Sequence, residues 1–127
     1  MEITAHFLFG SPNINAQPIK VKLNKSHLSI RLPNRRTNLF SIQRNKILSL
    51  EENTRKQIEV VLTSRQQPVE GLLESTNDIH WDERYVVIKW DGNEETRLAI
   101  LAFRGHAAST SASDLLTWAE TSKLVRA

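Results

Sequence analysis

The stretch IKVKLNKSHLSIRLPNRR, residues 19–36, decides the fold of the first half of the chain. Its apolar residues alternate with polar ones on both sides of a short polar segment, which is typical of two half-buried strands joined as a hairpin. If residues 24–27 form a four-residue loop, each apolar residue meets another across the pair: Leu23 opposite Leu28, Val21 opposite Ile30, and Ile19 opposite Leu32. The sequence therefore predicts an antiparallel hairpin with one apolar face and one polar face.

The same register gathers positive charge on the polar face of the hairpin. It places Lys20 directly opposite Arg31, with Lys22 beside them. Like charges directly opposite destabilise a strand pair, so we expect a bound anion, or an acid from elsewhere in the fold, to compensate. The candidate anion-binding or partner-binding residues are the six cations of the stretch: Lys20, Lys22, Lys25, Arg31, Arg35 and Arg36.

The net charge of +3 conceals an uneven distribution of charge along the chain. From Ile3 to Leu50 there is no Asp or Glu, whereas acids outnumber Lys and Arg from Glu51 onward. Such asymmetry is typical of a surface that binds nucleic acid or anionic lipid. Alternatively, the two halves pack together and neutralise each other. In that case the acidic stretch 64–83, which contains Glu70 and Glu74, is the expected partner of the basic hairpin.

Other segments of the first eighty residues also follow the two-residue period of strands. We predict strands near residues 2–9 and over QIEVVLTS, residues 57–64. Residues 39–52 are apolar with a polar interruption at 43–46, which fits two short strands or one bulged strand. Residues 69–75 favour one further short strand.

A second hairpin is predicted over residues 84–103, because an Asp-Gly pair begins its turn at 91–94. Its strands are apolar on both faces. Val86, Ile88 and Trp90 share one face, and Tyr85 and Val87 share the other. Both faces must therefore be covered.

We expect the cover for the second face to come from the C-terminus. A linker is predicted over residues 104–112, followed by an amphipathic helix at about 113–125 that begins with Ser113 as its cap. The whole chain, residues 1–127, is then one domain of the mainly β class. It is a small bent antiparallel barrel or sandwich of about seven strands, within about residues 2–103, closed by one C-terminal helix.

This order of elements, and the stretch DLLTWAETSKLV at residues 114–125, resemble the pleckstrin-homology-like superfamily, including its GRAM-type members. In PH domains a tryptophan of the closing helix plugs the end of the barrel, and Trp118 is the matching position. Phosphoinositide-binding members have a Lys early in the first hairpin and two basic residues, one apart, on the next strand. Lys20 or Lys22 and Arg31 match the outer places, but Ser29 stands where the middle cation belongs. The resemblance thus implies an interaction scaffold rather than a headgroup-specific lipid-binding domain.

One segment has the residue types of a metal site. In DIHWDE, residues 78–83, the side chains of Asp78, His80 and Asp82 share one face if the chain is extended, and carboxylates with an imidazole can hold a transition metal. A solvated acidic turn is the alternative that burial preferences favour. We therefore expect no catalytic residue, no metal and no cofactor.

The remaining expectations concern compartment and partner. The chain has no cysteine, its first ten residues lack a cationic leader, and no apolar run reaches the length of a membrane span, so we expect a cytoplasmic protein. We predict a non-enzymatic binding or scaffold module whose partner is another protein or a second copy of the chain. The alternative is a small β-barrel that binds nucleic acid or anionic lipid, and a metal-dependent enzyme is less favoured.

Overall fold

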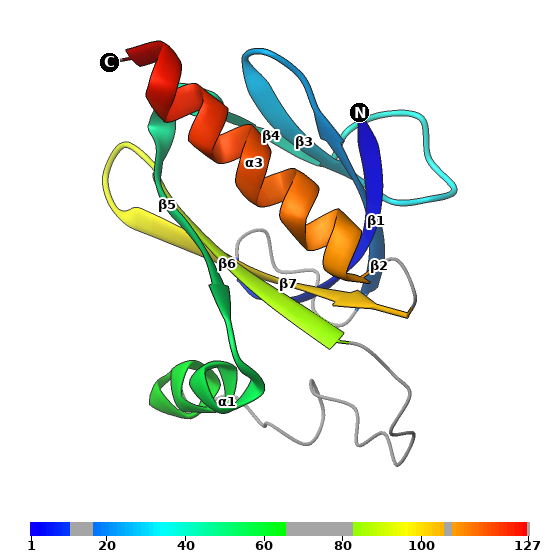
Figure 1. Cartoon of the computed structure of the whole chain (residues 1–127), viewed down its shortest axis with the longest axis vertical. Helices are drawn as coiled ribbons and strands as arrows, with labels where there is room; N and C mark the ends of the chain where they lie inside the picture. Colours follow the sequence, from blue (N-terminus) through cyan, green and yellow to red (C-terminus); the bar gives the residue numbers. More distant parts are fainter. Residues whose placement is uncertain (11–16, 66–82, 106–107, 127) are drawn as a thin grey trace.

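The computed structural model of the protein describes residues 1–10, 17–65, 83–105 and 108–126 (Figure 1). Seven antiparallel strands form a single sheet in the order β4-β3-β2-β1-β7-β6-β5. The sheet is strongly bent but not closed, because β4 and β5 are its two edges. The strands are β1 (Glu2–Gly10), β2 (Gln17–Leu23), β3 (His27–Arg31), β4 (Phe40–Gln43), β5 (Ile47–Asn53), β6 (Glu83–Asp91) and β7 (Thr96–Arg104).

The mainly β prediction, with about seven strands and a C-terminal helix, is confirmed, whereas one open sheet takes the place of the closed barrel or sandwich. The chain passes from one edge of the sheet to the other through a single 3-10 turn, η1 (Arg44–Lys46). The region 39–52 therefore forms two short strands, the first of the two predicted alternatives. The described residues also form two helices, α1 (Arg55–Ser64) and α3 (Ala108–Arg126). No helix in the described ranges has the length and apolar character needed to cross a membrane.

The predicted register of the first hairpin is correct. Strands β2 and β3 pair Leu23 with Leu28 and Val21 with Ile30, and Lys20 lies opposite Arg31. Strand β3 ends at Arg31, so the expected pair of Ile19 with Leu32 lies beyond the ladder. The second hairpin pairs Asp91 with Thr96, which places its loop one residue later than predicted.

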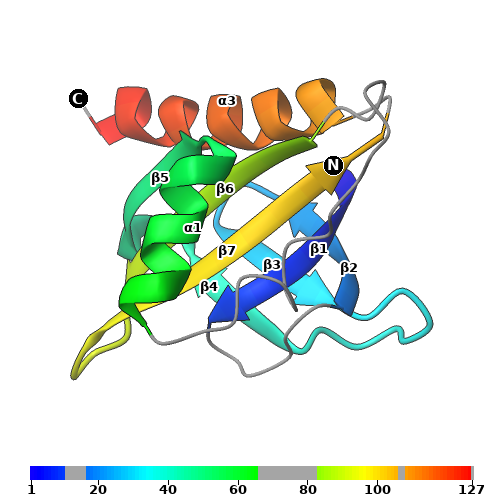
Figure 2. The ribbon, with the colours of Figure 1, turned by 90° about the horizontal axis from the view of Figure 1, so that it is seen from below.

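The main core fills the concave side of the bent sheet, beneath α3 (Figures 1 and 2). Apolar residues at alternate positions of the strands point into it, and the buried Ala108, Ala112 and Leu115 of α3 cover it. The sheet bends where β1 shifts register between Phe7 and Phe9, since a bulge kinks its strand. The sheet residues of this core are Ile3, Ala5, Phe7, Ile19, Val21, Leu23, Leu28, Ile30, Ile42, Val86, Ile88, Trp90, Ala99, Leu101 and Phe103.

A smaller core lies on the opposite face of the second hairpin. As predicted, Tyr85 and Val87 point to this face, away from Val86 and Ile88. The predicted cover is wrong: α1 covers this face with Ile58 and Leu62, while the C-terminal helix covers the first face.

The same helix corrects the strand predicted over residues 57–64. Thr54 accepts a hydrogen bond from the Gln57 backbone N–H, and the Gln57 side chain accepts one from the Thr54 N–H. This capping box starts a helix, and Ile58 and Leu62, four residues apart, then lie on one helical face. The short β-branched run around Val60 suggested a strand, but these local signals prevail.

Helix α3 begins at Ala108, five residues before the predicted start, so most of the predicted linker is helical. Gly105, directly after β7, has a φ of 86°, and its carbonyl accepts a hydrogen bond from the Ala108 N–H. The small side chains of Ala108 and Ala112 allow the first turns of the helix to lie on the sheet. Ser113 is an exposed residue within the helix rather than its cap.

Candidate functional site: the basic hairpin and the open edge

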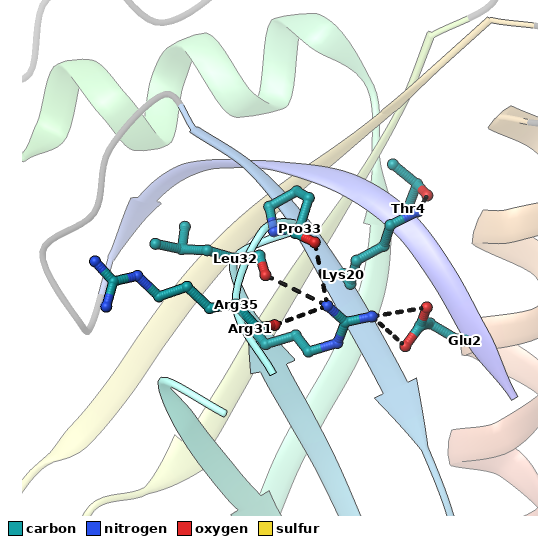
Figure 3. Close-up of polar contacts among 7 residues, drawn as sticks. All are labelled: Glu2, Thr4, Lys20, Arg31, Leu32, Pro33 and Arg35. Atoms are coloured by element: carbon teal, nitrogen blue, oxygen red, sulfur yellow. Dashed lines mark hydrogen bonds and ion pairs between the residues drawn. The ribbon is translucent and has the colours of Figure 1, made fainter. Parts of the chain in front are cut away.

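Arg31, at the end of β3, is neutralised by Glu2 of β1 (Figure 3). Its Nη2 donates to both carboxylate oxygens of Glu2, at 3.0 and 3.1 Å. Its Nη1 donates to the Arg35 carbonyl at 3.0 Å and, more weakly, to the carbonyls of Leu32 and Pro33 at 3.4 Å. The guanidinium therefore links β3 to β1 and to the loop after β3. Its charge has a partner within the fold.

Lys20 of β2 lies opposite Arg31 of β3, as the register predicts. Its ammonium donates to the Thr4 hydroxyl at 2.8 Å. Figure 3 shows the two cationic groups on the same side of the sheet, with the Glu2 carboxylate next to Arg31. The acid that relieves the repulsion is thus Glu2. The acids expected for this role, Glu70 and Glu74, lie outside the described residues.

Of the other four predicted cations, Lys22 alone lies beside this pair. Lys22 is exposed on β2, opposite Glu2 in β1. Lys25 is exposed in the turn before β3, whereas Arg35 and Arg36 are exposed in the loop after β3, at its other end. The Arg35 side chain extends away from the Arg31 guanidinium (Figure 3). The six cations therefore line a long strip across the hairpin rather than one compact anion site.

The possible metal site at Asp78, His80 and Asp82 falls in a segment that the structure does not describe. In the ranges that are described, no three His, Asp or Glu side chains come together in a way that could hold a metal ion.

One concavity among the described residues was not predicted. It has a volume of about 490 Å³ and lies between the edge strand β4 and the turn that joins β6 to β7. Phe40 and Trp90 form its apolar part, with ring centroids 6.1 Å apart and planes at 21°. The sequence feature that could have located this edge is the polar interruption at residues 43–46. It marks the place where the chain leaves β4 and passes to β5, a strand with which β4 does not pair. The lining residues are Phe40, Ser41, Ile42, Gln43, Lys46, Trp90, Asp91, Gly92, Asn93 and Arg97.

Trp118 fixes α3 to the end of the first hairpin, near η1. Its ring packs against the main core, and its Nε1–H donates to the Asn24 carbonyl at 2.8 Å. The Arg44 guanidinium lies 4.7 Å from the ring centroid and also donates to the Trp118 carbonyl. A cation over the indole face and a hydrogen bond from its edge hold the ring in one orientation. The placement of Trp118 against the sheet was predicted.

A charged cluster lies where β6, β7 and α1 meet. The Glu83 carboxylate lies 2.7 Å from Arg104 Nε and 3.8 Å from Arg55 Nη1. Burial, together with the neighbouring Glu83 carboxylate, raises the pKa of the Tyr85 phenol well above its ordinary value. Because the Arg55 pair joins α1 to β6, this cluster helps to fix the helix on the sheet.

No family model matches the chain, and no curated protein is significantly similar to it.

Proposed function

We propose that the protein is a non-enzymatic, PH-like binding module that works in the cytoplasm and whose partner is another protein. The observation that carries the proposal is the open sheet: the edge strands β4 and β5 are consecutive in the chain, yet neither pairs with the other. A free strand edge offers unpaired backbone N–H and C=O groups, which can pair with a strand of another chain.

Three features support the PH-like part of the proposal. Seven antiparallel strands form a strongly bent sheet, a C-terminal helix packs over its concave side, and Trp118 of that helix packs against the core. These are the features on which the sequence resemblance rests.

Site-specific photo-crosslinking in the native cell tests the proposal. A photoreactive phenylalanine analogue is placed at Gln43 on β4, at Leu48 on β5, or at Lys56 on α1 as a control; all three residues are exposed. We expect a discrete protein adduct from at least one of the edge positions and none from Lys56. No adduct at either edge, or the same adducts at all three positions, would reject the proposal.

Binding of nucleic acid or anionic lipid is the second candidate. It is favoured by the four exposed cations Lys22, Lys25, Arg35 and Arg36, which belong to a stretch of 48 residues, 3–50, that contains no acid. The same photoreactive analogue placed at Lys22 distinguishes the two candidates. Adducts with RNA or lipid at this position would favour binding of nucleic acid or anionic lipid. The metal-dependent enzyme is tested by elemental analysis of the purified protein, and stoichiometric metal would favour it.

A further inference from the structure

No other described strand pairs with the outer side of the edge strand β4, and this side lies next to the concavity described above. The Arg44 N–H donates to the Ser26 carbonyl at 2.8 Å, which continues the β3–β4 register by one residue. In an antiparallel pair, residues that bond across the ladder alternate with residues whose N–H and C=O point away from it. Arg44 and Ile42 therefore bond to the β3 side, whereas both backbone groups of Ser41 and the N–H of Gln43 point to the other side. The Gln43 carbonyl belongs to the first turn of η1, since Gln43 is the N-cap of that turn.

The lining of this concavity combines aromatic surface with positive charge. Phe40 is only half-buried, and its ring stacks on Trp90 at the base of the concavity. Lys46 and Arg97 also line it, and neither forms an ion pair within the described part of the chain. The acid in this lining, Asp91, accepts the backbone N–H of Asn93 at 2.9 Å and so belongs to the turn. The site thus combines strand backbone, an apolar surface and two cations that form no ion pair with another described residue.

We propose that β4 takes up an extended acidic peptide of a partner protein, which pairs with the outward backbone groups of Ser41 and with the N–H of Gln43. An apolar side chain of this peptide packs against Phe40 and Trp90, and its carboxylates face Lys46 and Arg97. The inference rests on the proposed function and names the place and the chemistry of the partner. Backbone pairing supplies affinity, while the pocket for one side chain and the charges supply specificity.

A second copy of the chain fits this edge less well. Two β4 strands paired with each other would bring Lys46 and Arg97 of both copies together, and like charges across an interface oppose association. An acidic segment instead complements both cations.

The matched pair Gln43→Pro and Gln43→Ala tests the backbone part of the inference. Gln43 has a φ of −65°, the value that proline adopts, so proline removes the outward N–H without straining the strand. Alanine removes the same side chain but keeps the N–H. The full chain is used to select binders from a displayed library of random peptides, and each selected peptide is then measured against both variants by fluorescence anisotropy.

We expect the selected peptides to be acidic with an apolar residue among the acids. Loss of one hydrogen bond and the bulk of the proline ring should weaken their binding to Gln43→Pro by about tenfold or more, with little change for Gln43→Ala. The charge reversals Lys46→Glu and Arg97→Glu should also weaken binding, and added salt should reduce these differences. Thermal melts of Gln43→Pro at or above the wild-type temperature would show that the fold is intact.

Three results would overturn the inference. The first is that the selected peptides bind Gln43→Pro as tightly as the wild type, and the second is that the library yields no binder. The third is a wild-type dimer that Gln43→Pro converts to a monomer, because a second copy of the chain would then occupy the edge. Crosslinking from Leu48 without crosslinking from Gln43 would also remove β4 as the site, while leaving the binding module itself in place.

Discussion

Glu2 lies directly beside Arg31, although 29 residues separate them in the sequence, and its two carboxylate oxygens are 3.0 and 3.1 Å from one guanidinium nitrogen. The contact spans β1 and β3, with Lys20 and Lys22 of β2 between the two strands. An acid at the chain's second position therefore compensates the repulsion that the hairpin register creates. The acid-free stretch from Ile3 to Leu50 is neutralised in part by the residue that precedes it.

Glu2→Gln should lower the free energy of unfolding, because it leaves Arg31 and Lys20 facing each other without a carboxylate. The side chains of Arg31 and Glu2 are 23% and 42% exposed, so the pair is partly screened and the loss should be about 0.5–1 kcal/mol. Denaturant unfolding at low salt measures it, and 0.5 M chloride should reduce it.

Glu51→Gln is the matched control, since it removes the same charge from an exposed glutamate that makes no ion pair within the described residues. Equal stability losses in the two variants would show that net charge, rather than the contact with Arg31, is responsible.

The sequence predicted the hairpin and its register because the apolar residues of one buried face leave a single way to pair the strands. It could not predict Glu2 as the partner of Arg31. That contact depends on the pairing of β1 with β2, which places Glu2 opposite Lys22. The number of acids in residues 64–83 says nothing about which acid lies near the hairpin. The concavity at β4 was missed for a related reason: Phe40 and Trp90 come from segments fifty residues apart, and only the bend of the sheet brings them together.

The helical nature of residues 55–64 could have been read from the sequence, since Thr54 and Gln57 have the spacing of a capping box. Thr54→Ala should remove this cap and lower the free energy of unfolding by about 1 kcal/mol. The control is Thr63→Ala, near the other end of α1, where an exposed threonine gives way to a better helix former and stability should not fall. Equal losses at both positions would contradict the role of the cap.

Trp118→Ala should destabilise the protein strongly, because it removes the packing of α3 on the core and the contact with Arg44. The ring is only partly buried, so we expect a loss near the lower end of the range of about 3–5 kcal/mol for such truncations. Trp118→Phe keeps an aromatic ring under Arg44 but removes the hydrogen bond to Asn24, and should cost about 1 kcal/mol beyond the change in packing. Urea unfolding measures both. An unchanged transition in Trp118→Ala would disprove that the ring fixes the helix.

Tyr85 should make the protein less stable at alkaline pH. Burial raises the pKa of its phenol above the ordinary value of about 10, so above pH 10 the unfolded chain releases this proton while the folded chain keeps it. The unfolded state then binds fewer protons, and the free energy of unfolding falls by about 1.4 kcal/mol per pH unit. Below pH 10 the phenol is protonated in both states and the contribution is constant.

Because Tyr85 is the only tyrosine in the chain, tyrosinate absorbance reports this group directly. We expect no tyrosinate signal at pH 10.5 until the protein is unfolded. The fall in stability above pH 10 should be smaller in Tyr85→Phe by the contribution of this one group. A tyrosinate signal with a midpoint near pH 10 in the folded protein would contradict the prediction.

The last prediction concerns anion binding by the basic hairpin. In the wild type, the Arg31 guanidinium is already bound to the Glu2 carboxylate. Millimolar sulfate should therefore raise the melting temperature only slightly. In Glu2→Gln the same guanidinium is released beside Lys20 and Lys22, and sulfate or anionic liposomes should then stabilise the protein more than they stabilise the wild type. Each exposed contact contributes at most about 1 kcal/mol, so the difference should be small and should disappear at high salt.

Sulfate also stabilises proteins in general by exclusion from their surface, so the response must be compared with Glu51→Gln, which has the same net charge. The double variant Lys20→Ser, Arg31→Ser should show only the general response, because it lacks the pair of cations that would hold the anion. If Glu2→Gln and Glu51→Gln respond equally to sulfate and to liposomes, Arg31 and its neighbours do not accept anions. The hairpin would then be ordinary solvated β-structure whose one charged contact is internal.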